Sequence, residues 1–386
     1  MAIQYVKRKN TDCSKWDNLK DMFGEDDLQA RWVADMDFRC PDCVIEAIRD
    51  YADFGVFGYY RPRDSYVQAF QDWERGQHGY DVQRDWIRFS PGVVPAVNWM
   101  IQVLTEPGDP VIVQTPVYYP FLDAVRNNSR KLVCSDLRCT GGIYRVDFED
   151  FEKQITEQGV KLFILCSPHN PVGRVWNRDE LRTMLEICKK HGVRVISDEI
   201  HHDFVFGGHC HTPSALVGPY DDFLVTLTAA TKTFNLAGVQ NSFVIIPDSG
   251  IRESFDRFTK SIRISGGNPF GYLAVESAYR GGLGWLQEVR ETIWENYRFV
   301  RASLLQALPG LVISPLEGTY LLWIDFAAYL KTEEMHDFMQ NTCRLAFDYG
   351  EWFGGERFGT HIRMNLATSK ELVQEAVSRI TGSLPR

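Results

Sequence analysis

The chain has 386 residues, of which 44% are hydrophobic and 24% charged, which is ordinary for a globular protein. Its formal net charge is −9 at pH 7, and this acidic balance argues against nucleic acid or an anionic membrane as a partner. A chain of this length exceeds the usual limit for one hydrophobic core, so we expect two domains.

The cysteines and the N-terminus indicate a cytoplasmic protein. No apolar stretch approaches membrane-spanning length, and the charged segment 1–9 lacks the apolar core of a secretory signal. The nine cysteines are scattered and odd in number, which favours reduced thiols over a disulfide framework. Cys40 and Cys43 form a lone CxxC pair, whereas a zinc site would need a second pair, so we expect no metal there.

From residue 50 to residue 284 the sequence alternates between short β-rich runs and helix-length segments. The predicted strands are 86–89, 110–113, 162–166, 193–196, 223–227 and 241–246, and helices are expected at 95–101 and 178–191. Repeated β–α units specify a mainly parallel sheet covered by helices. We therefore predict an α/β fold with a large domain over 50–284.

The pattern changes after residue 284. We predict a long amphipathic helix, a strand pair, a second helix, a strand and a final helix, at 286–308, 311–314 with 319–325, 333–347, 361–366 and from Lys370. This order is typical of a smaller α+β domain.

Three polar residues each follow an apolar run of the large domain. Asn170 comes after 162–166, Asp198 after 193–196, and Lys232 after 223–227. The carboxyl ends of parallel strands share one edge of a sheet, and ligands bind at that edge. A lysine that forms a Schiff base, a carboxylate for a pyridinium nitrogen and an amide for a phenolic oxygen are what a pyridoxal phosphate site requires.

Each of these residues, taken singly, could have a common structural role instead of a role in a cofactor site. A lone lysine such as Lys232 is most often exposed in a turn, and Asn170 followed by proline is common turn chemistry. A buried Asp198 is costly unless a cation pairs with it, and a protonated pyridine ring supplies one. Glu199 falls on the other side of the strand, so we expect it to be solvated or to pair with a helix cap. The order of the three residues after three strands outweighs these alternatives.

Histidines follow Asp198 closely. His201 is three residues away and near enough to reach a cofactor's edge. His201, His202, His209 and His211 together resemble a metal cluster, but no carboxylate–histidine helix spacing accompanies them, so we expect no metal site.

The segment 90–95 is a strand-to-helix junction that contains a glycine. Backbone N–H groups at such a helix start suit a phosphate, which makes Gly92, Val93 and Val94 candidates, although a tight turn also explains the glycine. Neither GxGxxG after an early strand nor GxxxxGK[ST] occurs, so the sequence indicates neither a nicotinamide cofactor nor a nucleoside triphosphate.

Two aromatic residues and one arginine are candidates for the rest of the site. Tyr118 and Tyr119 could stack on a flat ring, although an aromatic pair in a loop is more often ordinary packing. Arg363 interrupts an apolar strand of the small domain. Arginine suits bidentate capture of a substrate carboxylate, and a structural ion pair is the equal alternative.

From residue 33 to residue 367 the chain resembles fold-type I pyridoxal phosphate enzymes, in particular the cystalysin-like carbon–sulfur β-lyases of the aminotransferase superfamily. The stretches that carry the resemblance are 92–97, 115–121, 166–176, 197–201 and 232–238. The resemblance implies that Lys232 is the Schiff-base lysine, Asp198 the pyridinium partner and Asn170 the donor to the phenolic oxygen. It further implies that Tyr118 stacks on the ring and that Arg363 anchors the substrate carboxylate.

The resemblance also implies contacts outside this set. Gly92, Val93 and Thr231 would lie near the phosphate, and Tyr59 would enter the partner subunit's site in a homodimer. Residues 1–49, which show little βα pattern, would pack with 285–386 as the small domain. Ala229 and Gln240 stand where aspartate aminotransferases have a serine and an arginine, so phosphate binding must rely on other groups.

The implied reaction is β-elimination from L-cystathionine or another L-cysteine S-conjugate to pyruvate, ammonia and a thiol. Lys232, Asp198 and Tyr118 would be the catalytic residues, and Arg363 and Tyr119 would contact the substrate. A class I/II aminotransferase is the alternative, because composition and spacing do not separate the two reactions. A regulatory protein on the same scaffold is a third possibility, against which the complete set of site residues weighs.

Overall fold

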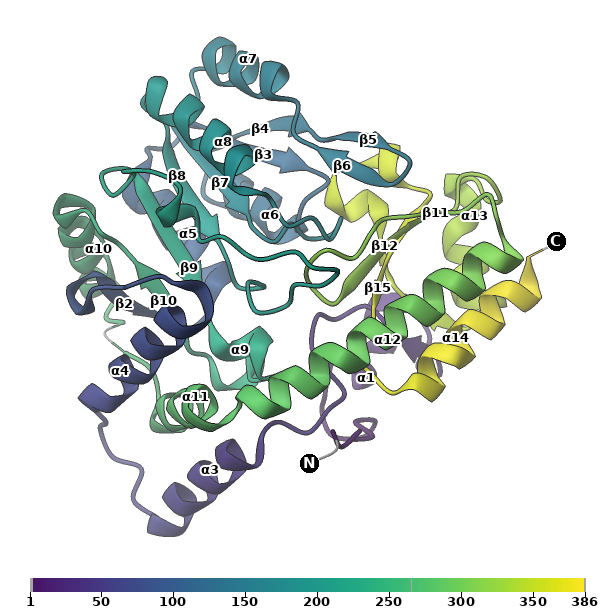
Figure 1. Ribbon diagram of the computed structural model, residues 1–386, viewed down its shortest axis with the longest axis horizontal. Coiled ribbons are helices and arrows are strands. Elements are labelled where there is room, and N and C mark those ends of the chain that lie inside the picture. The colour runs from purple at the N-terminus through teal and green to yellow at the C-terminus, as the bar shows by residue number, and fades with distance from the viewer. Residues whose placement is uncertain (1–2, 265, 385–386) are drawn as a thin grey trace.

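The computed structural model describes residues 3–264 and 266–384 and is built around a seven-stranded sheet (Figure 1). The strand order is β2-β10-β9-β8-β7-β3-β4, and β10 alone runs antiparallel to its neighbours. These strands are β2 (Ile87–Ser90), β3 (Pro110–Thr115), β4 (Lys131–Asp136), β7 (Leu162–Cys166), β8 (Arg194–Asp198), β9 (Leu224–Thr228) and β10 (Ser242–Ile245). The prediction of a mainly parallel sheet is confirmed.

Helices cover both faces of this sheet because its central strands are apolar on both sides. Ile164 of β7 belongs to the core under α5 (Val93–Leu104), α6 (Tyr119–Asn127) and α10 (Ser249–Ser261). Its neighbours Phe163 and Leu165 belong to the core under α7 (Phe148–Gln158) and α8 (Arg178–Lys190). Strand residues alternate between faces, so a continuous apolar run is what a strand buried on both faces needs.

A four-stranded sheet forms the second layer of the molecule. Its order is β11 (Val312–Ile313), β12 (Leu321–Asp325), β15 (His361–Asn365) and β14 (Asp348–Tyr349). The long helix α12 (Leu283–Ala307) and the last helix α14 (Lys370–Ser383) lie side by side next to it (Figure 1). The short strands β1 (Gln29–Ala30) and β13 (Leu345–Ala346) pair in parallel, so the N-terminal segment adds to this part of the fold. The domain boundaries at residues 50 and 284 stay a prediction.

The remaining elements are short or lie at the margins of the two sheets. They include the two-stranded hairpin β5 (Arg138–Thr140) and β6 (Ile143–Arg145), and a π-helical turn at Glu74–His78 that extends α4. The other helices are α1 (Ser14–Asp17), α2 (Leu19–Phe23), α3 (Asp42–Phe54), α4 (Asp64–Trp73), α9 (Ala230–Thr233), α11 (Pro269–Gly281) and α13 (Thr332–His336). Among the described residues, no helix is both long and apolar enough to cross a bilayer.

The predicted helix over 333–347 is wrong in its last five residues. α13 passes into a π-helical turn at Asp337–Thr342, and the helix ends before Arg344, whose φ of 56° is left-handed. Leu345, Ala346 and Phe347 are all fully buried. Three consecutive buried residues suit a strand between two layers better than one face of a helix.

Leu165 offers a test of the central strand. Its side chain is fully buried, so we expect Leu165→Ala to lower the free energy of unfolding by about 2–5 kcal/mol through lost burial and a cavity. The matched control is Leu283→Ala at a 38% exposed position, which we expect to change stability by no more than about 0.5 kcal/mol. Denaturant titration measures both, and equal effects would contradict this description of the core.

Candidate active site

A pocket lies where β7, β8 and β9 end. Its lining residues come from five strand ends of the large sheet and from the N-terminal segment: Ala34, Pro91, Gly92, Val93, Val94, Pro95, Tyr118, Cys166, Asn170, Asp198, Ile200, His201, Thr231, Lys232 and Ala237. Every residue that we predicted to contact a cofactor lines this pocket, except Tyr59. The structure therefore brings together predicted residues that lie up to 140 positions apart, from Gly92 to Lys232.

Lys232 is half-buried in the short helix α9. Its Nζ donates a hydrogen bond to the carbonyl of Ala34 at 2.5 Å. Burial lowers the pKa of the Lys232 amine to about 8, and the nearby carboxylates of Asp35 and Asp198 oppose that change. A lysine with this pKa is partly neutral near physiological pH, which a nucleophile and a base both require.

Asp198 is the last residue of β8 and is also buried. Its Oδ1 accepts a hydrogen bond from the backbone N–H of Ile200 at 3.0 Å. Burial raises the pKa of this carboxyl group to about 7, although that hydrogen bond and Lys232 favour the charged form. A cation placed against Asp198 inside the pocket would relieve the cost of burying its charge.

Asn170 connects the pocket to the small sheet. Its Oδ1 accepts a hydrogen bond from Arg363 Nη1 at 3.1 Å, which leaves the amide N–H groups for an acceptor in the pocket. Arg363 Nη2 donates to the carbonyl of Trp32 at 3.0 Å. Arg363 Nε is buried and has no hydrogen-bond partner among the described residues, so the guanidinium keeps a donor for an anion.

Asp348 is a site residue that the sequence analysis missed. It faces Arg363 across the antiparallel pair β14–β15, and the two side chains form a buried ion pair. Burial raises the pKa of Asp348 to about 6, while Arg363 opposes the shift. The only signal in the sequence was an acid that follows the apolar residues 345–347. Arg363 thus has the structural ion pair that we considered, together with a free donor.

The start of α5 offers a place for a phosphate. Gly92 is the N-cap residue, and the first turn of this 12-residue helix carries no acidic side chain. A Cβ at Gly92 would lie 3.3 Å from Pro95 Cδ, so a side chain fits tightly there. The partial positive charge of the helix N-terminus is therefore free to interact with an anion in the pocket.

The other predicted residues take different positions. His201 lines the pocket with its ring 5.6 Å from Tyr320, and its buried Nδ1 has no hydrogen-bond partner in the described chain. The ring of Tyr119 lies 5.5 Å from that of Tyr118 but packs against Phe353, outside the pocket lining. Tyr59 is fully exposed and lies outside the pocket of its own chain.

One expectation about the segment after β8 needs correction. Glu199 is neither solvated nor at a helix cap: it is buried, with Oε2 3.0 Å from His211 Nε2 and Oε1 accepting from Ser197 and Ser214. A carboxylate that is buried away from water needs hydrogen-bond partners of this kind. The four histidines from His201 to His211 do not converge, because His201 lines the pocket and His209 is exposed.

These features fit pyridoxal phosphate. The group combines an anionic phosphate, a ring nitrogen that carries a proton, a ring oxygen and an aldehyde. The pocket presents a helix N-terminus, a buried carboxylate, free amide donors and a half-buried lysine of lowered pKa. The orphaned Nδ1 of His201 is a further polar atom that a ligand would satisfy.

Asp198 makes cofactor-free protein sensitive to pH. Its pKa is raised from 3.8 to about 7, so the folded state holds a proton that the unfolded state releases between these values. The contribution of Asp198 to the free energy of unfolding is therefore fully present below about pH 4 and is lost as the pH rises to about 7. In apoprotein, we expect Asp198→Asn to gain stability over wild type across this range, by roughly 4 kcal/mol at most. Denaturant titrations at pH 5 and pH 8 measure this difference, and an equal difference at both would contradict it.

Comparisons with known proteins agree with this geometry. The model of the family "Aminotransferase class I and II" matches residues 33–380. The "Cystathionine beta-lyase PatB" of Bacillus subtilis is 40% identical over 382 residues, 98% of each chain. The structure of cystalysin from Treponema denticola, which contains pyridoxal 5'-phosphate, has a TM-score of 0.94 and 36% identity over 99% of this chain and 98% of its own. The PLP-bound C–S lyase from Staphylococcus hominis has a TM-score of 0.93 and 30% identity over 99% of this chain and 97% of its own. This chain belongs to the aminotransferase class I and II family.

Proposed function

We propose that this protein is a pyridoxal phosphate-dependent carbon–sulfur β-lyase that acts on L-cystathionine or other L-cysteine S-conjugates. The observation that carries the proposal is the convergence of Lys232, Asp198 and Asn170 on one pocket, with Arg363 bonded to Asn170. Similarity to a cystathionine β-lyase and to C–S lyases favours the lyase reaction over others of the family. With L-cystathionine, the substrate and one water molecule would give pyruvate, ammonia and homocysteine.

Pyridoxal phosphate, when bound, supplies an electron sink for bonds to the substrate's Cα. Asp198 would hold the ring nitrogen, and the Asn170 amide would donate to the ring oxygen. The N-terminus of α5 and Thr231 would hold the phosphate, which compensates for the serine and arginine replaced by Ala229 and Gln240. Tyr118 would lie against the ring.

Lys232 would act as the base. Its neutral amine, present because burial lowers its pKa to about 8, takes the proton from the substrate's Cα. The bond between Cβ and sulfur then breaks, and the electron pair leaves on the sulfur. Arg363 would hold the substrate's α-carboxylate, which fixes the Cα–H bond relative to Lys232, and Tyr119 would contact the remainder of the substrate. Asp348 would set the position of the Arg363 guanidinium.

An aminotransferase is the second candidate, favoured by the name of the family whose model matches. It would use the same base and the same carboxylate anchor. The two reactions differ in products, because a transaminase stops after one turnover unless a keto acid restores the cofactor.

Product analysis separates these candidates. We expect the holoenzyme mixed with L-cystathionine, without added keto acid, to form pyruvate, ammonia and homocysteine over many turnovers. Lys232→Ala should lose nearly all of this activity, because the base is gone, and Arg363→Lys should mainly raise KM. One stoichiometric conversion that only a keto acid restarts would overturn the lyase assignment, and normal turnover by Lys232→Ala would overturn the site.

We also propose a homodimer in which Tyr59 enters the partner's pocket. Four large hydrophobic side chains of one segment are exposed: Phe54, Val56, Phe57 and Tyr59. Exposed apolar side chains grouped in this way usually mark an interface with another protein chain. The resemblance to the β-lyase family supports the same arrangement.

Mixed dimers test the arrangement directly. Lys232→Ala lacks the base, and Tyr59→Ala would weaken cofactor binding, so each homodimer should have low activity. A mixed dimer of the two variants has one pocket with both residues intact only if Tyr59 acts across the interface. Activity should therefore return when the two variants are unfolded and refolded together, and a mixture that stays inactive while forming dimers would contradict the proposal.

The location that we propose is the cytoplasm. All nine cysteines are free thiols in the described structure, and four of them are buried. Such usage is typical of a reducing compartment.

A further inference from the structure

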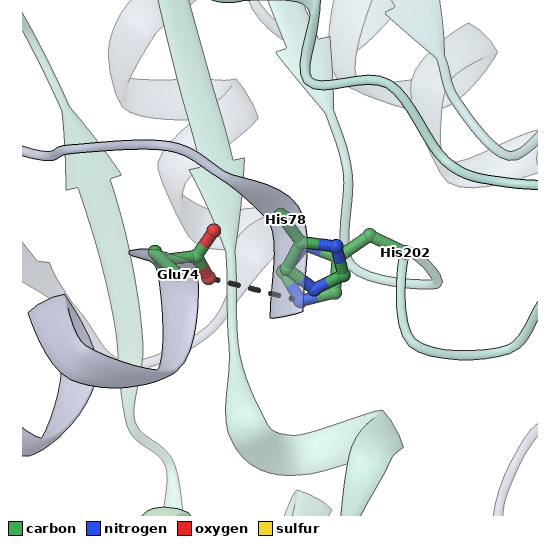
Figure 2. Close-up of side chains that lie close together, drawn as sticks. All are labelled: Glu74, His78 and His202. Atoms are coloured by element: carbon green, nitrogen blue, oxygen red, sulfur yellow. Dashed lines mark ion pairs between the residues drawn. The ribbon is translucent and has the colours of Figure 1, made fainter. Parts of the chain in front are cut away.

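A second cluster of ionisable side chains lies outside the pocket. Figure 2 shows Glu74, His78 and His202, which come close together from two separate segments. The ligand atoms of these three residues all lie within 4.8 Å of one another. Within residues 3–264 and 266–384, they are the one group of three His, Cys, Asp or Glu residues with this property.

The local backbone explains why Glu74 and His78 face the same point. They are the first and last residues of the π-helical turn that extends α4, four positions apart on one side of that turn. Residues at this spacing can bind one ion together, as paired ligands on metalloprotease helices do. A π-helical turn is rare and is found frequently at functional sites. His202 joins them from the turn after β8.

Asp203 orients both imidazole rings. Its Oδ1 lies 2.9 Å from His78 Nε2, and its Oδ2 lies 3.2 Å from His202 Nε2. The Oδ2 atom also accepts a hydrogen bond from Thr233 Oγ1 at 2.6 Å. Ligating histidines commonly have a carboxylate partner of this kind, which fixes the ring and increases its basicity.

The charges around the cluster favour a cation. Glu74, Asp203 and Glu199 are buried carboxylates, and they face the rings of His78, His202 and His211. Glu199 pairs with His211, and Asp203 pairs with both other histidines. Glu74 Oε1 is left without a hydrogen-bond partner in the described structure, at 3.8 Å from His202 Nε2, although Glu74 is only 2% exposed. An unsatisfied carboxylate oxygen at such depth is costly unless an ion completes its coordination.

We propose that Glu74, His78 and His202 bind one Zn²⁺ ion. Two imidazoles and one carboxylate are ligands that zinc accepts readily, and the site is largely shielded from solvent because Glu74 and His202 are buried and His78 is half-buried. The ion would join the end of α4 to the turn after Asp198. Through Asp203 and Thr233 it would also brace the helix that carries Lys232. This proposal is independent of the reaction that the pocket catalyses.

Metal analysis of the holoenzyme tests the proposal. After unfolding with a chelator and refolding with Zn²⁺, we expect about one Zn²⁺ per chain and a higher Tm than after refolding without metal. Glu74→Gln and His202→Gln should each lose most of this binding, whereas His209→Gln, at an exposed histidine, should keep it. Refolding with Co²⁺ should add a visible ligand-field band that Zn²⁺ abolishes and that Glu74→Gln lacks.

Two results would overturn the proposal. One is refolded wild-type protein that binds neither metal above the background of buffer. The other is Zn²⁺ or Co²⁺ bound equally by wild type and Glu74→Gln, which would place the ion elsewhere. The first result needs measurements on wild-type protein only, so it can be obtained even if a variant fails to fold.

Discussion

The parallel pairing of β7, β8 and β9 is the constraint on which the site depends. The register places Cys166 beside Asp198 and Asp198 beside Leu227, so the three strands end at one level. The polar residues that follow them therefore meet, although 62 positions separate Asn170 from Lys232. The apolar strands beneath keep water away, which lowers the pKa of Lys232 and raises that of Asp198.

A second link joins the two sheets through Arg363. This residue is held by Asp348 and by the Trp32 carbonyl, and it donates in turn to Asn170. The group that we expect to bind the substrate's carboxylate is thereby fixed against the group that we expect to orient the cofactor. A shift of the small sheet relative to the large sheet would disturb both the expected substrate contact of Arg363 and the expected cofactor contact of Asn170. Substrate binding therefore depends directly on how the two sheets pack.

Much of this arrangement could be predicted because its signals are local. Strand-like apolar runs followed by Asn170, Asp198 and Lys232 predicted the sheet, its direction and the cofactor class, and the family resemblance added the role of Arg363 and the reaction. Asp348 could not be found in this way, because its role comes from its register opposite Arg363. The cluster of Glu74, His78 and His202 was missed for a similar reason. It depends on a π-helical turn that no sequence pattern indicated, and on a contact between distant segments.

The central claim is that Lys232 is the residue that joins the cofactor. Borohydride reduction of the holoenzyme, followed by proteolysis and mass spectrometry, tests it most directly because reduction makes that link permanent. We expect the mass of the reduced cofactor on the peptide that contains Lys232. Cofactor attached to a different lysine, or protein that retains no pyridoxal phosphate, would contradict it.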